Sequence, residues 1–488
     1  MISSNWKSVR ENGIKIFWAL LFFTLPVTSF PFIPAELGGK TLVRPLSMYP
    51  LVALILLVTL PRLFKRPLPR TFLPLLAFIL IAFISSLISF SSEKEGLLGI
   101  SAADRMLRNL ATLGLGVAFY LTVVLLIKDW RDIEFSLRWL YAGFGVALLW
   151  GSAQALYIIH FNNIYFRLLN QIQSLVSTRK LFNNRVSGLT YEPKWFAEQI
   201  CFLLLPWLLG AVISKRSLFP WRYKWITVEW VMLAWATAIL FFTFSRTGLF
   251  LAVGLFAFSF LISRAETHRA RVKCEGQKSG GKRKLIFETL LLVVSLVTII
   301  VIVGSQNPYF SRLWRYWTEA KSRNRTYLEY IAFQQRFVYW ETAFNIFEEQ
   351  PLLGVGLGNY AFYFKEALPA QFYRLPEIVR QITPAEGRDR LITPKNLPAR
   401  LLAETGILGL LAFLSFSIAV LGCALFLYTA RDSSTQYVGV GGLLSMAVFV
   451  VIIFSFDSFA IPNMWISFGL ITAAAHIPYP SLKNQVKE

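Results

Sequence analysis

The sequence predicts an all-α polytopic membrane protein, with about twelve transmembrane helices and one large external loop between the ninth and the tenth. The first observation is composition: of 488 residues, 55% are hydrophobic and only 16% are charged. Soluble chains carry about 45 to 50% apolar residues and about a quarter charged ones. The second observation is that apolar runs of about 20 residues, the length a bilayer core requires, recur along the chain.

Twelve apolar segments are the expected membrane spans. They cover residues 14–32, 45–60, 72–90, 107–127, 137–159, 195–213, 225–244, 248–262, 285–304, 401–428, 439–456 and 461–477. The chain then divides into three parts: 1–304 holds the first nine spans, 305–400 is the large external loop with short helices, and 401–488 holds the last three spans and a cytoplasmic tail. The first span follows a weakly basic leader, and its length favours an uncleaved anchor over a signal peptide.

Basic residues set the expected orientation. The formal net charge is +22, which in a soluble chain would suggest nucleic-acid binding. Here much of the excess falls in alternate loops, at 62–70, 128–131, 215–224 and 264–284, which the positive-inside rule assigns to the cytoplasm. Both termini are then cytoplasmic. The basic loops are expected to meet anionic lipid headgroups, and no nucleic-acid partner is expected.

Cysteine and histidine are too sparse for a metal site. Cys201 and Cys423 lie in apolar runs, Cys274 lies in a basic loop, and the three histidines are far apart. This pattern indicates neither a disulfide framework nor a zinc or iron centre. No metal and no cofactor are therefore expected.

Three cations stand out in the segments expected outside the membrane. Arg246 lies between two apolar spans, where a guanidinium costs about 2.5 to 3.5 kcal/mol at mid-bilayer and less near the interface. It is either an interface residue whose side chain extends to the headgroup region, or a residue whose planar guanidinium binds two phosphoryl oxygens at once. Arg336 has the same two alternatives in kind: its guanidinium binds phosphoryl oxygens, or it lies on the polar face of an interfacial helix. Lys395 is a phosphate contact or base at the membrane mouth, or part of a solvated helix start.

Two carboxylates are the candidate catalytic acids or bases. Glu192 precedes Pro193 in an aromatic stretch, and its alternative role is to begin a helix. Glu404 lies in the first turns of the helix that re-enters the membrane, where a carboxylate also favours the positive end of the helix dipole. Catalytic and structural roles remain open for both residues.

A glycine-rich run and two asparagines are expected to shape the same region. Gly354, Gly356 and Gly358 precede Asn359 in the sequence PLLGVGLGN. The run lacks the Gly-Lys-Ser/Thr of a nucleotide-binding loop, and no strand precedes it. It is predicted to turn sharply and pack against a helix. Asn396 lies between two prolines at the expected start of that helix.

Four motifs, in order, resemble the O-antigen ligase and O-antigen polymerase superfamily of bacterial envelope proteins. They are Ser245-Arg246-Thr247-Gly248, Arg336-Phe337-Val338-Tyr339-Trp340, the glycine-rich run 351–359, and Lys395-Asn396 leading to 402–411. The resemblance covers about residues 233–414. It implies a metal-independent glycosyltransferase of the bacterial inner membrane whose active site faces the periplasm. The donor would be a glycan on undecaprenyl pyrophosphate.

The resemblance also implies roles for individual residues. The family's donor-binding arginines carry over onto Arg246 and Arg336, with Lys395 as a third pyrophosphate contact. Family ligases carry His-Asn where this chain has Lys395-Asn396. An unperturbed lysine is protonated at neutral pH and would hold phosphate, so the duty of base passes to Glu192 or Glu404. This departure favours a polymerase of O-antigen or exopolysaccharide repeats over a ligase that transfers the lipid-linked glycan to lipid A core or another acceptor.

Two other classes of protein remain open. A polysaccharide transporter or flippase would need polar residues at the membrane midplane, and the apolar spans are nearly free of acids. A scaffold subunit of an export complex would use the loop 305–400 as a docking surface. The expected partners are the lipid-linked oligosaccharide and, in the same pathway, proteins that set polysaccharide chain length or export the chain.

Overall fold

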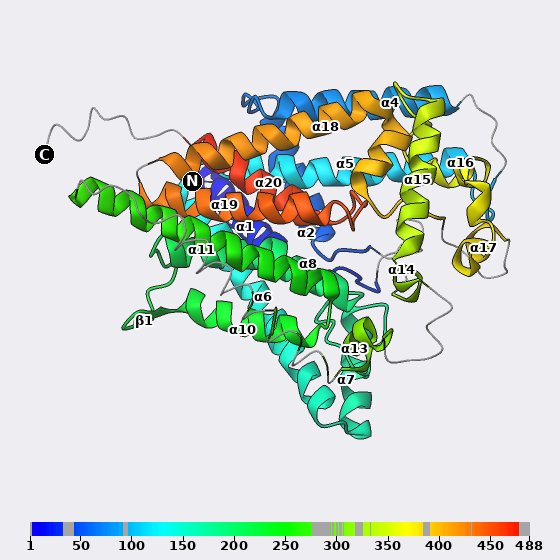
Figure 1. Ribbon diagram of the computed structural model, residues 1–488. Coiled ribbons are helices and arrows are strands. Elements are labelled where there is room, and N and C mark those ends of the chain that lie inside the picture. Colours follow the sequence, from blue (N-terminus) through cyan, green and yellow to red (C-terminus); the bar gives the residue numbers. More distant parts are fainter. Residues whose placement is uncertain are drawn as a thin grey trace, which may run out of the picture.

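The computed structural model describes residues 2–32, 43–90, 96–275, 307–317, 326–331, 333–383, 391–430 and 432–477, with a few single positions between 294 and 305. Within these residues the chain is mostly helical (Figure 1). The long helices run roughly alongside one another, and α15 (Gln334–Glu349) stands across their ends at the right of the view. The predicted all-α class is therefore confirmed for the part of the chain that the structure describes.

The helices and strands have the following bounds. The first half of the chain forms α1 (Ile2–Phe23), α2 (Met48–Leu54), η2 (Ile55–Thr59), α3 (Leu60–Leu63), α4 (Phe72–Phe90), α5 (Ala102–Leu126), α6 (Trp130–Ile159), α7 (Asn163–Val176), α8 (Pro193–Gln199), η3 (Ile200–Leu204) and α9 (Leu205–Ile213). After a hairpin of β1 (Arg222–Tyr223) and β2 (Ile226–Thr227) come α10 (Val228–Phe242), α11 (Arg246–Glu275), α13 (Pro308–Arg315), α14 (Tyr327–Tyr330), α15, α16 (Tyr360–Ala367), η5 (Ala370–Phe372), α17 (Pro376–Ile382), α18 (Leu397–Thr429), α19 (Ser433–Ile452) and α20 (Pro462–Ala475).

Seven helices in the described part of the chain are long and apolar enough to cross a membrane. They are Phe72–Phe90, Ala102–Leu126, Trp130–Ile159, Pro193–Ile213, Arg246–Thr267, Leu397–Thr429 and Ser434–Ile452. Two more expected spans are shorter apolar helices, Met48–Leu63 and Val228–Phe242. The expected span 285–304 lies almost entirely outside the described residues. The chain is thus a multi-pass membrane protein, and the count of twelve stays a prediction.

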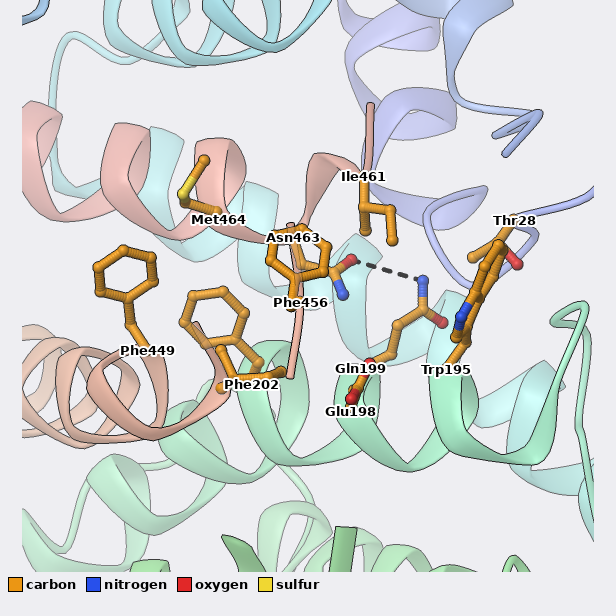
Figure 2. Close-up of a pocket in the computed structure, with 11 residues that line it drawn as sticks. Thr28, Trp195, Glu198, Gln199, Phe202, Phe449, Phe456, Ile461, Asn463 and Met464 are labelled. Atoms are coloured by element: carbon orange, nitrogen blue, oxygen red, sulfur yellow. Dashed lines mark hydrogen bonds between the residues drawn. The ribbon is translucent and has the colours of Figure 1, made fainter. Parts of the chain in front are cut away.

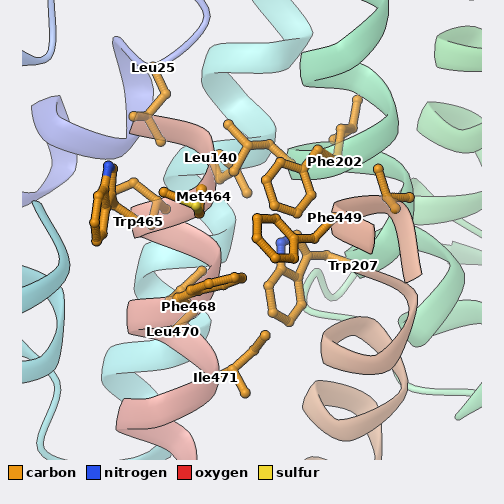
Figure 3. Packing of buried hydrophobic residues seen from close by; sticks show 14 of the residues in the cluster. Leu25, Leu140, Phe202, Trp207, Phe449, Met464, Trp465, Phe468, Leu470 and Ile471 are labelled. Carbon is orange, nitrogen blue, oxygen red and sulfur yellow. The ribbon is translucent and has the colours of Figure 1, made fainter. Parts of the chain in front are cut away.

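Large aromatic side chains pack the centre of the helix bundle. Trp207 on α9 and Trp465 on α20 are fully buried. The rings of Phe449 and Phe468 meet edge to face, with centroids 4.9 Å apart (Figure 3). Each aromatic side chain buries about 150 to 250 Å². These contacts hold α9, α19 and α20 together, and α19 and α20 also contribute to the lining of the cavity of the candidate site.

The glycine-rich loop 351–358 lies against a break in α18. Gly406 interrupts that helix with φ 63° and ψ −167°, a conformation essentially restricted to glycine. The backbone amide of Gly356 donates to the carbonyl of Glu404 at 2.9 Å. The loop therefore satisfies peptide groups that the break leaves open, as irregular backbone at membrane depth requires.

The opposite side of this loop contacts α4 and α5. Ser89 Oγ donates to the Val355 carbonyl at 2.5 Å, and Asn359 Nδ2 donates to Ser89 Oγ at 2.9 Å. A Cβ on Gly358 would lie 2.3 Å from Asn109 Nδ2, and the φ of Gly358 is +94°. Close approach and backbone conformation thus both require glycine here. The predicted sharp turn against a helix is confirmed.

Candidate active site

The first turns of α8 place a buried carboxylate beside a lysine. A proline begins the helix, where its fixed φ suits the first position. Lys194 and Glu198 follow one turn apart, with Lys194 Nζ 3.3 Å from Glu198 Oε1. Glu198 is only 5% exposed, and Lys194 Nζ also donates to the Ser455 carbonyl at 2.9 Å. This lysine therefore neutralises a buried charge and ties α8 to the segment that follows α19.

Glu198 borders a narrow cavity between α8, the end of α19 and the start of α20 (Figure 2). Its volume is about 20 Å³, which is room for about one water molecule. The lining is mostly apolar, and its polar members besides Glu198 include Gln199 and Asn463. Gln199 Nε2 donates to the Leu25 carbonyl at 3.0 Å and lies 3.5 Å from Asn463 Oδ1. The carboxylate is thus buried from bulk solvent but borders an internal space.

Arg336 and Lys395 both lie beside the first turns of α15. Arg336 is half-buried and close enough to Glu198 for the two charges to interact. Lys395 Nζ lies 4.9 Å from the ring centroid of Tyr339, which is one turn along α15 from Arg336. The backbone amide of Lys395 donates to Asp457 Oδ2 at 2.7 Å. The same 455–457 segment therefore contacts both Lys194 and Lys395.

Arg246 begins α11, and the first turn of α11 packs on α8. Ser245 Oγ accepts a hydrogen bond from the Gly248 amide at 3.2 Å, which caps the helix. A Cβ on Gly248 would lie 2.4 Å from the Cβ of Ala197, the neighbour of Glu198. Glycine at 248 therefore permits the close contact. The structure thus places Arg246 at the start of a helix that packs on α8, and Arg336 within electrostatic reach of Glu198 on α8. Lys395 contacts the 455–457 segment, which also contacts α8 through Lys194.

The two carboxylates singled out in the sequence are both engaged in ion pairs. Glu192 is the residue before α8, as its structural alternative required, and its Oε1 lies 2.7 Å from Arg179 Nη1. Both side chains of that pair are more than a third exposed. Glu404 is 2% exposed and accepts a hydrogen bond from Arg400 Nε at 2.8 Å. The two residues lie apart in the fold, Glu192 just before α8 and Glu404 on α18.

Arg400 is the centre of a buried polar network near the break in α18. Besides Glu404, its guanidinium donates to the Asp457 carbonyl and to Asn109 Oδ1, each at 2.5 Å. Asn396 caps the same helix, because its Oδ1 accepts from a first-turn amide at 2.9 Å. This network joins α5, α18 and the segment after α19. It fixes the position of the backbone at the start of α18, directly after Lys395.

Sequence reasoning missed Glu198 and Arg400. Each belongs to a pair of opposite charges four residues apart, Lys194 with Glu198 and Arg400 with Glu404. Such spacing places both side chains on one face of a helix. A pair of this kind inside an apolar segment is costly unless it is satisfied, and that is the signal that could have found both.

The fold and the site define a multi-pass membrane protein that gathers charged side chains at one end of its helices. Residues 231–414 match a family model described as O-antigen ligase (Wzy_C), which supports the resemblance of the motifs to the O-antigen ligase and polymerase superfamily. The family supports a membrane enzyme of O-antigen assembly. A search of curated proteins gave no match.

The matched segment covers part of the candidate site. It runs from α10 into α18 and contains Arg246, Arg336, Lys395 and Glu404. Helix α8, with Glu198, lies outside it. The cations that the resemblance assigns to the donor therefore come from the matched segment, whereas the residues that line the cavity beside Glu198 all lie outside it.

Proposed function

We propose that the protein is a membrane glycosyltransferase that polymerises oligosaccharide repeats carried on undecaprenyl pyrophosphate, at the outer face of the bacterial inner membrane. The family match supports an enzyme of O-antigen assembly. The observation that carries the finer proposal is that three cations surround the Glu198 region: Arg246 begins the helix that packs on α8, Arg336 interacts with Glu198, and Lys395 binds the 455–457 segment that also contacts Lys194. A lipid diphosphate donor presents two phosphates to such a group of cations.

The reaction is a displacement at the anomeric carbon of the donor sugar. A hydroxyl oxygen of the acceptor sugar forms the new bond to that carbon. The bond from the carbon to the diphosphate oxygen breaks, and the lipid diphosphate leaves with the electron pair. Arg246, Arg336 and Lys395 would stabilise the charge that develops on the leaving group, because fixed cations need no reorganisation as the charge forms. The hydroxyl proton must pass to a base.

We assign the role of proton acceptor to Glu198. It borders a cavity and lies within electrostatic reach of Arg336. All three carboxylates are paired, Glu404 with Arg400, Glu192 with Arg179 and Glu198 with Lys194, but of the three Glu198 is the one that lines this cavity. A base must reach the hydroxyl directly or through one water, and the cavity beside Glu198 has room for about one water.

Lys395 supports a polymerase more than a ligase. Family ligases carry histidine at this position, and an ammonium group holds phosphate as a point charge instead of accepting a proton. The Lys395 side chain is exposed over the Tyr339 ring. A charged group in that position suits a contact with a diphosphate that enters from outside.

The glycans of cells lacking the gene test the proposal. Complementation uses wild type, Arg246→Ala, Arg336→Ala, Lys395→Ala and Glu198→Gln at matched membrane expression. The control is Arg380→Ala, which removes an exposed arginine of α17 outside the site. We expect the null cells and the four site variants to accumulate single lipid-linked repeats, and the control to restore long chains.

Other outcomes would contradict specific parts of the proposal. Long chains that remain on the lipid carrier would identify a ligase. Unchanged glycans in the null cells would reject an enzyme of this pathway and leave a transporter or a scaffold. Full activity of Glu198→Gln, with loss in the arginine variants, would keep the donor site and remove Glu198 as the base.

A further inference from the structure

A second cavity lies at the end of the helices away from α15. It has a volume of about 530 Å³ and is formed by three segments that are distant in sequence. These are the connection between α3 and α4, the C-terminal end of α5, and the C-terminal end of α20. The first two segments belong to loops that the positive-inside rule assigns to the cytoplasm.

Four basic side chains line this cavity: Arg66, Arg70, Lys128 and His476. All four belong to exposed residues, and no acidic residue is among those that line it. Within the described part of the chain, the side chains of the two arginines and the lysine form no ion pair or hydrogen bond. Their charges are therefore available to an anionic ligand.

The nearest carboxylates in the sequence are engaged by the backbone. Asp129 Oδ1 accepts a hydrogen bond from the Asp132 amide at 3.0 Å, and Asp132 Oδ2 accepts one from the Lys128 amide at 2.8 Å. These bonds cap the start of α6, which is an ordinary use of aspartate. Asp132 stays within electrostatic reach of Lys128, so the cavity's positive charge rests mainly on the two arginines, with the lysine adding to it.

The rest of the wall is apolar, and this decides between possible ligands. Besides two prolines, the remaining lining residues are Leu68, Val124, Leu125, Ile127, Ala473 and Ile477. A site for free phosphate needs polar groups around the whole anion, whereas a lipid offers a phosphate and an apolar body. Basic pockets between membrane helices on the cytoplasmic side are suited to anionic headgroups.

We propose that this cavity binds the phosphate headgroup of an anionic phospholipid. Topology alone explains why basic residues lie in these loops, but it does not require three loops to converge on one cavity. The residues 66–70, 128 and 476 are brought together only by the packing of α5 on α20 and of α4 on α5. The site is separate from the candidate active site and does not depend on the proposed function.

Native mass spectrometry of the full-length protein in a non-ionic detergent tests this site. The probes are phosphatidylglycerol, phosphatidylcholine and inorganic phosphate, the last added alone and as a competitor. The site variant is Arg66→Gln/Arg70→Gln/Lys128→Gln, and the matched control is Lys215→Gln/Arg222→Gln/Lys224→Gln. The control removes the same charge from exposed residues of another predicted cytoplasmic loop.

We expect wild type to bind phosphatidylglycerol more tightly than phosphatidylcholine. The site variant should bind phosphatidylglycerol about 100-fold more weakly, because each basic residue near an anionic lipid contributes about fivefold. The control should change the affinity less than twofold. If the site variant is poorly folded by its melting curve, Arg70→Gln alone should weaken binding about fivefold and Arg70→Lys should retain it.

Three results would overturn the inference. Equal affinity of wild type for the two lipids would show that the cavity does not select an anionic headgroup. Equal weakening by the site variant and the control would show that general surface charge, and not this cavity, attracts the lipid. Displacement of the lipid by inorganic phosphate at matched concentration would identify a free-phosphate site instead.

Discussion

Gly406→Ala should destabilise the protein through the break in α18. The residue has φ 63° and ψ −167°, and a Cβ there would lie 2.3 Å from the carbonyl oxygen of Leu352. Two costs follow. An alanine in this region of backbone conformation costs about 1 to 3 kcal/mol. Forcing the glycine-rich loop away from the new methyl group costs about 1 to 3 kcal/mol more, the usual range for overpacking.

The opposing effects are smaller. Alanine restricts the unfolded chain and returns about 0.4 to 1 kcal/mol of stability. The loop could retreat, but it would then weaken the hydrogen bond from the Ile407 amide to the Pro351 carbonyl, now 2.9 Å. Each such bond contributes about 1 kcal/mol. The net loss is therefore about 1 to 6 kcal/mol.

The assay is thermal unfolding of the purified protein in one detergent at one heating rate, because membrane proteins often unfold irreversibly. The matched control is Gly422→Ala in the same helix, where a Cβ meets nothing within 4 Å. Alanine is the better helix former by about 1 kcal/mol, so this variant should melt at or above the wild-type temperature. If Gly406→Ala melts as high as Gly422→Ala, the reasoning about the break is wrong.

Three further predictions concern the polar groups around the helices. Arg400→Met should lower the free energy of unfolding by about 3 to 5 kcal/mol, because Glu404 is 2% exposed and would lose its charged partner. The double variant Arg400→Met/Glu404→Met should recover much of the melting temperature, and failure to recover it would refute the pairing. Asn396→Ala should cost about 1 kcal/mol by removing the cap of α18, while Asn396→Ser should cost less in the same melting assay. Burial raises the pKa of Asp432, but hydrogen bonds from the first turn of α19 outweigh it and hold that pKa below its usual value. A carboxyl group whose pKa is lowered by folding stabilises the folded protein at pH values above its unfolded-state pKa of about 3.9. This stabilisation is lost as the pH falls through the folded-state pKa. The melting-temperature advantage of wild type over Asp432→Asn should therefore shrink below about pH 4, and an advantage that persists there would contradict this.

Several features of the site followed from the sequence. The glycine spacing at 354, 356 and 358 predicted a sharp turn against a helix, and all three residues have positive φ. The prolines around Lys395 predicted a helix start, and α18 begins at Leu397. These features are local, because glycine and proline restrict or release their own backbone angles. An isolated arginine between apolar spans is costly, which marks Arg246, and Arg336 is marked by the amphipathic stretch that it precedes.

Other features could not be predicted in this way. Glu198 lies inside an apolar run, and its importance rests on the cavity formed with α19 and α20, more than 250 residues later. The partners of Arg400 include Asn109 on α5, which is 291 residues away. No local pattern encodes such contacts, because they depend on which helices pack together.

The sequence by itself determined that this is a multi-pass helical membrane protein whose motifs resemble the O-antigen ligase and polymerase superfamily, because hydropathy and local motifs depend on neighbouring residues. Only the tertiary structure decided which charges meet. It placed Arg336 near Glu198, seated the glycine-rich loop in the break of α18, and gathered four basic residues around a second cavity. The physical reason is that a charge in an apolar environment must find its partner through helix packing, and that packing joins segments that are far apart in the chain.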